Sequence, residues 1–209
     1  GNLPHDRLLL VPGNHDVDRG KVTKGVRMRQ DALVKRQSQE DIADLLGDDD
    51  ERMALLKRHA AYLAFVEGWL GQLPSLPWWQ RAIEINGCRL HIAGIDSAWM
   101  ACRDEDRGQL LIGRYQLTQT VETVEAEGAH WRIALLHHPW DYLAEFDSHA
   151  ARALVHQHCD LLLRGHLHRP APERVVPPDP SRACLELPTG CVYETSQYPN
   201  AFQWIELSP

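Results

Sequence analysis

Three short runs of apolar residues constrain the fold of this chain more than any other feature. They are residues 8–11, 131–136 and 161–163, and in none of them do apolar and polar side chains alternate. A strand with one face in water alternates in this way, whereas a strand covered on both faces does not. Because helical patterns separate these runs, we expect an α/β fold in which a parallel sheet is covered on both sides.

The rest of the sequence predicts further strands and helices. The Asn-Gly pair at 86–87 predicts the turn of a β-hairpin over residues 82–95. Apolar residues at helical spacing predict one helix that begins near Asp48 and stops before Pro74. The remaining expected elements are helices over residues 116–127 and 148–159, and strands over residues 184–187 and 201–207.

Composition narrows the class of protein. The 209 residues are 44% hydrophobic and 24% charged, which suits one globular domain with a sizeable core. Five cysteines without a Cys-x-x-Cys pair argue against a disulfide framework, so we expect a cytoplasmic protein. No apolar run approaches the roughly 18 residues of a membrane span, and we expect no membrane partner. The net charge of −7 argues against passive binding of nucleic acid, although not against a nucleotide held by metal ions.

Residues 17–73 are predicted to be a charged helical insertion. Residues 17–39 contain seven Lys or Arg and two acidic residues, whereas residues 40–51 contain seven acidic residues and no basic one. Such blocks are usually the solvated faces of helices. The alternative is a lid whose basic half leans over an anionic substrate.

Each of the three apolar runs is followed by a cluster of side chains that can bind metal. Residues 13–16 read Gly-Asn-His-Asp, residues 137–139 read His-His-Pro, and residues 165–168 read Gly-His-Leu-His. Ligands of open α/β sheets bind beyond the carboxyl ends of the strands, so these three loops can meet at one site. Imidazole nitrogens and an amide oxygen suit a divalent ion such as Mn, Fe or Zn.

These clusters resemble the motifs of the calcineurin-like metallophosphoesterases, and most closely those of the bacterial cyclic-nucleotide phosphodiesterase-like branch. The resemblance rests on Val-Pro-Gly-Asn-His-Asp at 11–16, Leu-His-His-Pro at 136–139 and Gly-His-Leu-His at 165–168. It implies that residues 1–209 form a single domain, a two-sheet β-sandwich flanked by helices. It also implies a hydrolase of phosphodiesters or phosphomonoesters, with diesters favoured and nucleotides among the candidate substrates.

The resemblance further implies a role for individual residues. The residues that match metal ligands are Asn14, His137 and His166 for one ion and His168 for the other. The complete site would hold two divalent ions, with Mn expected before Fe or Zn, and a bridging hydroxide would attack the phosphorus in line. His15 matches the histidine that assists the leaving group, and Asp16 matches the acid that orients it. His138 has no ligand role in this pattern.

Two metal motifs of the family, an Asp-x-His and a Gly-Asp-x-x-Asp, are expected before Gly13, yet only twelve residues precede it. Similar strings at 147–149 and 47–51 do not follow buried strands, and we interpret them as coincidence. We therefore expect an N-terminal β-α-β portion in further chain upstream or a fused partner domain, and expect this chain alone to be inactive. Two alternatives stay open: a non-catalytic regulatory or binding module, and a nuclease effector of a larger defence or signalling protein.

The same reasoning predicts how the isolated chain behaves. If upstream strands normally pair with residues 8–11, that strand is left with an apolar edge and unpaired backbone groups. Such an edge recruits other chains, so we expect the isolated polypeptide to associate or to be poorly soluble.

Overall fold

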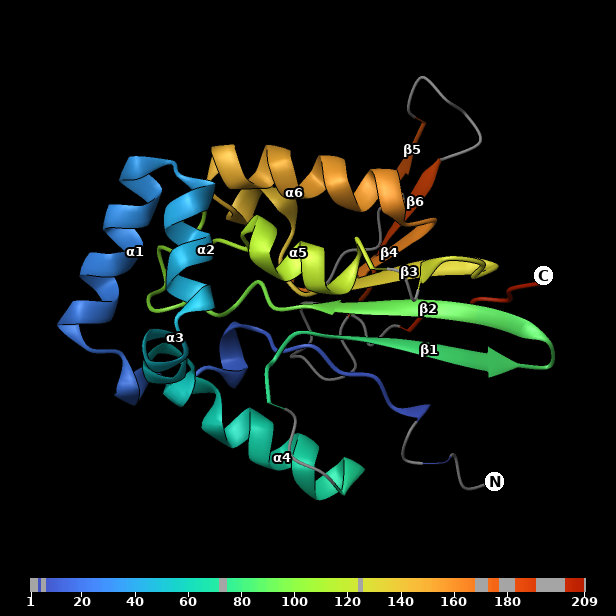
Figure 1. Cartoon of the computed structure of the whole chain (residues 1–209), viewed down its shortest axis with the longest axis horizontal. Coiled ribbons are helices and arrows are strands. Elements are labelled where there is room, and N and C mark those ends of the chain that lie inside the picture. The colour runs from blue at the N-terminus through green and yellow to red at the C-terminus, as the bar shows by residue number, and fades with distance from the viewer. Residues whose placement is uncertain are drawn as a thin grey trace.

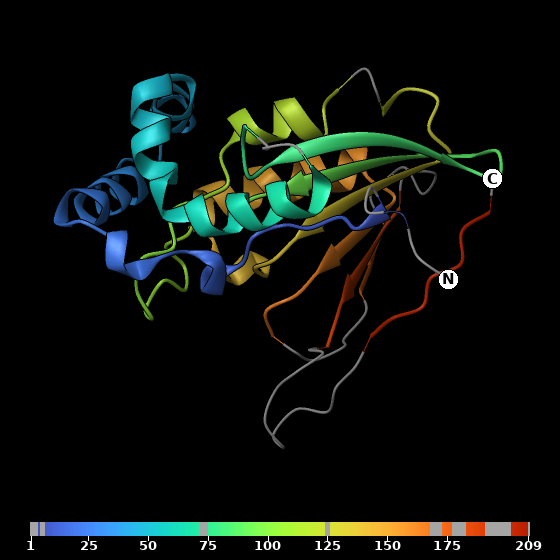
Figure 2. The same ribbon diagram turned by 90° about the horizontal axis from the view of Figure 1, so that it is seen from below.

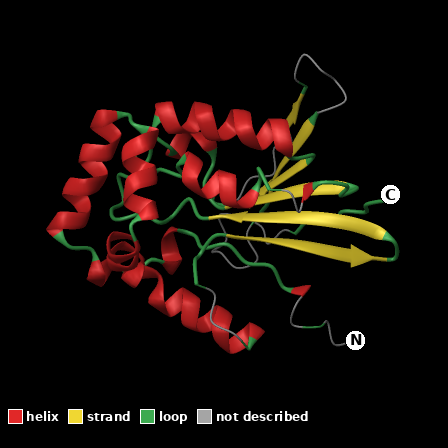
Figure 3. Ribbon diagram, in the orientation of Figure 1, coloured by secondary structure: helices red, strands yellow, loops and turns green. Residues whose placement is uncertain are grey.

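A six-stranded mixed sheet forms the centre of the protein (Figures 1 and 3). The computed structural model describes residues 4, 7–71, 75–123, 126–167, 173–176, 183–190 and 202–208. The strands are β1 (Trp79–Ile85), β2 (Cys88–Ile95), β3 (Trp131–Leu136), β4 (Leu161–Arg164), β5 (Glu173–Val175) and β6 (Cys184–Pro188). They are ordered β1-β2-β3-β4-β6-β5, with β2, β3, β4 and β6 parallel and with β1 and β5 antiparallel at the edges. The predicted α/β class is confirmed, and the strands described here all belong to this sheet.

Helices α5 (Arg114–Thr120) and α6 (Glu145–His158) cover one face of the sheet (Figure 1). They lie in the connections from β2 to β3 and from β3 to β4. In β3, Ala134 and Leu136 pack in the core beneath these helices, whereas Ile133 belongs to the cluster on the opposite face. The central strands are therefore covered on both sides, which is why their sequences do not alternate.

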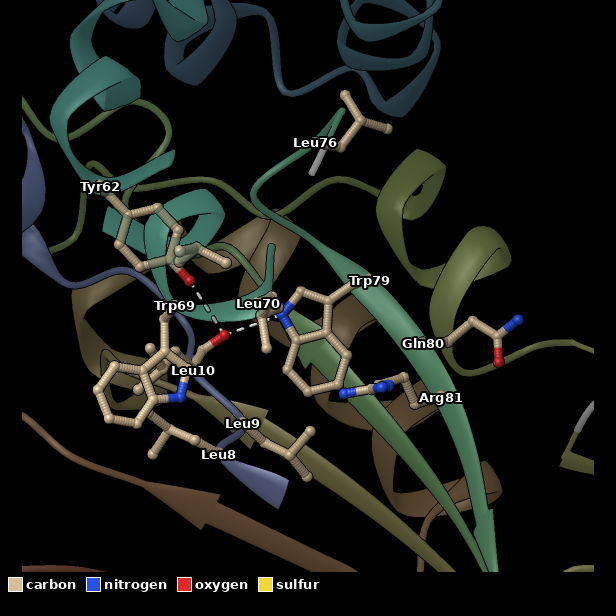
Figure 4. Close-up of a pocket in the computed structure, with 11 residues that line it drawn as sticks. Leu8, Leu9, Leu10, Tyr62, Trp69, Leu70, Leu76, Trp79, Gln80 and Arg81 are labelled. Atoms are coloured by element: carbon tan, nitrogen blue, oxygen red, sulfur yellow. Dashed lines mark hydrogen bonds between the residues drawn. The ribbon is translucent and has the colours of Figure 1, made fainter. Parts of the chain in front are cut away.

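Residues 8–11 lie against that opposite face, but the prediction that they form a strand is wrong. Residues 8–13, all of which the structure describes, join no ladder. The carbonyl oxygen of Leu10 instead accepts hydrogen bonds from the hydroxyl of Tyr62, at 3.0 Å, and from Nε1 of Trp79, at 2.8 Å (Figure 4). Leu9 packs against the sheet. The apolar run thus reflects partial burial of Leu9, Leu10 and Val11, with Leu8 exposed, and not pairing of the backbone.

A helical region lies beyond the carboxyl end of β2 (Figure 1). Its helices are α1 (Lys24–Arg36), α2 (Gln39–Gly47), α3 (Asp49–Leu56) and α4 (Ala60–Leu70). Asp48 caps α3 as predicted, because its side chain accepts a hydrogen bond from the backbone N–H of Glu51 at 2.9 Å. Helix α4 lies on the side of the sheet opposite α5 and α6, next to residues 8–11 (Figure 2). Between them is a cavity of about 260 Å³ with a mainly apolar lining.

The single helix predicted before Pro74 is divided in two. A 3₁₀ turn, Lys57–His59, separates α3 from α4 and directs two polar side chains inward. The guanidinium of Arg58 donates a hydrogen bond of 2.8 Å to the carbonyl of Ala101. Nε2 of His59 lies 3.2 Å from the carboxylate of Asp96, and both side chains are fully buried. The break therefore attaches the helical region to the segment that follows β2.

The predicted β-hairpin is confirmed. Asn86 and Gly87 have φ values of 51° and 79°, as the tightest hairpin turns require, and Ile85 pairs with Cys88. Other boundaries differ from the prediction. The helix expected over 116–127 ends at Thr120, and residues 202–208 join no ladder although a strand was expected there. Within the described parts of the chain, no helix has both the length and the apolar character needed to cross a bilayer.

Candidate metal centre

The carboxyl ends of β3 and β4 bring two of the predicted ligands together. These strands are parallel neighbours, and Leu136 is in register with Arg164. His137 directly follows β3, and His166 follows β4 by two residues. The ring nitrogens His137 Nε2 and His166 Nδ1 lie 3.2 Å apart. The prediction that the loops after these strands converge is therefore met by the geometry of the sheet.

Asn14 approaches the two histidines from the 3₁₀ turn Asn14–Asp16. Its side-chain oxygen Oδ1 lies 3.1 Å from His137 Nε2. This approach requires a glycine at position 13, because a Cβ atom there would lie only 2.7 Å from Cε1 of the His137 ring. Although residues 8–13 form no strand, the turn reaches the position that the sequence pattern predicted for it.

The donor atoms of Asn14, His137 and His166 fit a divalent transition metal. Ligands about 2.1 Å from one ion lie roughly 3.0–3.4 Å apart at octahedral or tetrahedral angles, which matches the two observed separations. Asn14 Oδ1 can only accept a hydrogen bond, and a neutral imidazole carries one ring proton. With its proton, His137 Nε2 can donate to Asn14 Oδ1 but cannot accept from His166 Nδ1, and without the proton it leaves Asn14 Oδ1 without this donor. A cation among the three atoms satisfies them all.

His138 is the third member of the histidine cluster. The possible donor atoms of His137, His138 and His166 all lie within 4.8 Å of one another. Nδ1 of His138 lies 2.9 Å from the hydroxyl of Ser97, which also accepts a 3.1 Å hydrogen bond from the backbone N–H of His138. Burial, together with the neighbouring His137 and His166, lowers the pKa of His138 to about 2, so its imidazole is neutral.

Tyr142 and Arg107 also border the cluster, and the motifs did not predict either of them. The Tyr142 ring meets His166 edge-on at 4.4 Å and stacks on His138 at 5.8 Å between ring centroids. The Arg107 guanidinium lies 5.7 Å above the Tyr142 ring and forms an ion pair with Asp141. Only the position of Tyr142, four residues after the adjacent histidines, could have suggested a role for it.

The predicted catalytic pair, His15 and Asp16, is exposed at the edge of this centre. The Asp16 carboxylate accepts a 2.8 Å hydrogen bond from the backbone N–H of Gly13 and so shapes the turn that carries Asn14 and His15. The assigned roles of His15 and Asp16 stay predictions. The remaining predicted ligand, His168, lies outside the described residues.

The two similar strings elsewhere have structural roles that agree with their interpretation as coincidence. Asp147 is fully buried and accepts hydrogen bonds from the backbone N–H groups of Ile112, at 2.5 Å, and Gly113, at 3.1 Å. Burial raises the pKa of its carboxyl group despite these bonds. The Asp48 side chain caps the N-terminus of α3, where it accepts a hydrogen bond from the backbone N–H of Glu51.

The basic residues of the helical region are in part neutralised by acidic partners. Arg19 pairs with Asp104 at 2.5 Å, Arg36 pairs with Asp41 at 3.0 Å, and Arg29 pairs with Glu51. These exposed or half-exposed pairs match the expectation of solvated helix faces more closely than that of a basic lid.

Comparison with known proteins agrees with the geometry. No curated protein matches the chain. The sequence profile of the calcineurin-like phosphoesterase family matches residues 2–170, which include Asn14, His137 and His166. Members of this family are phosphoester hydrolases that generally use two divalent metal ions. The match extends over most of the chain, and the protein therefore belongs to the calcineurin-like phosphoesterase family.

Proposed function

We propose that the protein hydrolyses phosphodiesters, with Mn²⁺ as the preferred metal and nucleotides as the preferred substrates. The observation that carries this proposal is the convergence of Asn14, His137 and His166, whose donor atoms lie 3.1 and 3.2 Å apart at the carboxyl edge of the sheet. Family membership supports phosphoester hydrolysis in general. The likeness of the three motifs to the phosphodiesterase-like branch favours diesters.

Each residue of the centre has a separate task in this proposal. Asn14, His137 and His166 would hold a metal ion, which would supply Lewis-acid chemistry toward the phosphoryl group. His15 lies one residue after Asn14, so the same turn delivers a ligand and a proton donor to one substrate. Protonated His15 donates to the leaving oxygen as the phosphorus–oxygen bond breaks. Neutral His138 packs behind the ligands and keeps water away from them.

Tyr142 and Arg107 support a nucleotide as the substrate. Aromatic rings and guanidinium planes are the surfaces on which proteins stack nucleobases. Tyr142 contacts His166 and His138, and Arg107 above it is largely exposed. A phosphodiester bound at the histidines would therefore extend one of its ester groups toward this pair.

The test is hydrolysis of bis(p-nitrophenyl) phosphate and p-nitrophenyl phosphate by the longest natural chain that carries these residues. We expect Mn²⁺-dependent turnover of both compounds, with a higher kcat/KM for the diester. Faster turnover of the monoester would overturn the diester assignment. Tight binding of Mn²⁺ without turnover of either compound would favour the non-catalytic module instead.

A further inference from the structure

Glu186 of β6 is a fully buried carboxylate surrounded by donors from three other elements. It accepts hydrogen bonds from His156 Nε2 at 2.6 Å, Trp140 Nε1 at 2.9 Å and Arg164 Nε at 3.2 Å. Nε of Arg152 lies 3.6 Å away. A buried carboxylate is retained only when it is paired and hydrogen-bonded, and Glu186 meets both conditions.

Two of these donors lie within two residues of histidines of the metal centre. Trp140 comes two residues after His138 and begins the 3₁₀ turn that holds Tyr142. Arg164 is the last residue of β4 and comes two residues before His166. One carboxylate therefore connects the loop after β3 to the carboxyl end of β4.

The loop after β4 has a backbone that needs such support. His166 has φ 70°, a left-handed conformation that residues other than glycine rarely adopt. A residue keeps this conformation only where its surroundings determine it more strongly than its own preference. The backbone around it is held by a bond from Thr189 N–H to the Arg164 carbonyl, at 2.8 Å, and by one from Gly165 N–H to the His137 carbonyl, at 3.2 Å. Glu186 adds the contact that fixes the Arg164 side chain.

We infer that Glu186 is a positioning residue for the metal centre. By holding Trp140 and Arg164 together, Glu186 sets the separation of His137 and His166. The inference rests on the metal centre of the proposed function and not on the choice of substrate. Outer residues that orient metal ligands affect metal binding without touching the ion. Glu186 does so through the loop after β3 and the end of β4, and not through a bond to a ligand.

The same two strands provide a matched control at their other end. Asp160 precedes β4, and its carboxylate accepts bonds from Arg132, near the start of β3: from the backbone N–H at 2.8 Å, from Nε at 3.0 Å and from Nη2 at 2.7 Å. This pair also connects β3 to β4 through a carboxylate and an arginine. It lies at the end of the strands away from the histidines, so losing it should affect stability and not metal binding.

The experiment compares Glu186→Gln and Asp160→Asn in the full chain, with the dissociation constant for Mn²⁺ measured by titration calorimetry and Tm measured without metal. Losing a residue that orients metal ligands typically weakens binding by about 10–100-fold, and we expect a loss in this range for Glu186→Gln. We expect Asp160→Asn to bind Mn²⁺ within about 2-fold of the wild type although its Tm falls. A Glu186→Gln protein with lowered Tm and unchanged Mn²⁺ affinity would overturn the inference.

A second pair of variants decides the matter if Glu186→Gln does not fold. Trp140→Phe removes the Nε1 donor from the loop after β3 together with part of the buried ring, and we expect several-fold weaker binding of Mn²⁺. Trp78→Phe is its control, because Trp78 is a buried tryptophan whose Nε1 donates to Gln119 at 2.9 Å, outside the two histidine loops. Equal Mn²⁺ affinity of these two variants would contradict the inference. A wild-type chain that binds Mn²⁺ but does not hydrolyse diesters would contradict the proposed function and leave the role of Glu186 in place, whereas no Mn²⁺ binding at all would remove both.

Discussion

Two segments deliver residues to the metal centre, and the protein holds them in different ways. His137 follows β3, which pairs with β2 along its whole length and with β4 over its last four residues. Asn14 follows residues 8–13, which join no ladder and are held at the Leu10 carbonyl by Tyr62 and Trp79. The β3 side of the centre is thus fixed by the sheet, whereas the other side depends on a few side-chain hydrogen bonds. We expect the two sides to respond differently to mutation and to acid.

The largest loss of metal affinity should follow from replacing His137, the ligand on the β3 side. His137 Nε2 is the metal-donor atom that both Asn14 Oδ1 and His166 Nδ1 approach. His137→Ala therefore removes the atom that lies next to both of the other ligands. We expect the affinity for Mn²⁺, measured by calorimetry, to fall by more than about 100-fold, the upper range for residues that only orient ligands. His149→Ala is the control, because His149 is an exposed histidine of α6. If both variants bind Mn²⁺ like the wild type, the assignment of the centre is wrong.

The second largest effect should be a loss of catalysis without a loss of metal, on the side of the centre that residues 14–16 form. His15→Ala in the catalytically complete protein should lower kcat by roughly 10²–10³, the usual result of losing one group that stabilises charge in the transition state. The metal content, measured by atomic emission, should stay close to that of the wild type because His15 is not a ligand. A loss of metal as large as that of His166→Ala would show that the two roles were assigned wrongly.

Smaller losses of stability and of metal affinity should follow from removing the hydrogen bonds that hold residues 8–13. Tyr62→Phe and Trp79→Phe each remove one donor to the Leu10 carbonyl, and each should lower the free energy of unfolding by about 1 kcal/mol in urea titrations. We expect the double variant also to bind Mn²⁺ more weakly, since Asn14 is then held less firmly. Trp131→Phe is the control, because Trp131 Nε1 donates to the Ser208 carbonyl and not to residues 8–13. Unchanged Mn²⁺ affinity in the double variant would show that Asn14 does not depend on these bonds.

The sequence predicted the β3 side better than the other side, for physical reasons. Both β3 and residues 8–11 are continuous, largely apolar runs, so the sequence could not distinguish a paired strand from an unpaired segment. The hairpin was predictable because the turn at Asn86 and Gly87 is determined locally. The break at Lys57–His59 was not, because it depends on carbonyl and carboxylate groups that lie some 40 residues away in the sequence.

Much of the candidate site was predictable for a similar reason. His137 and His166 are strong local signals at strand ends, and the parallel sheet guarantees that such ends lie together. Asn14 belongs to an equally recognisable motif, but it follows residues 8–13, which join no ladder. Glu186 and Tyr142 give no such signal. Glu186 is a single acid in a short strand, and only the folded structure shows that its side chain is directed inward toward Trp140, His156 and Arg164.

The smallest expected effect concerns stability at low pH. As the pH falls, the free energy of unfolding should lose the contribution of Glu186 on the β3 side but keep the contribution of Tyr62 on the other side. Burial raises the pKa of Glu186, but the bonds from His156 and Trp140 and the charges of His156 and Arg164 outweigh burial, and the net pKa is lowered. The unfolded chain therefore takes up the proton first, and the stabilisation by Glu186 is present above the usual value of 4.5 and lost as pH falls below it. In urea titrations, the difference in unfolding free energy between wild type and Glu186→Gln should thus be constant near neutral pH and shrink as the pH falls from about 5 to about 3. The difference between wild type and Tyr62→Phe should stay constant over this range, because a neutral hydroxyl and a carbonyl do not titrate there. If both differences shrink together, acid acts on the whole fold and the two sides are not held by different kinds of bond.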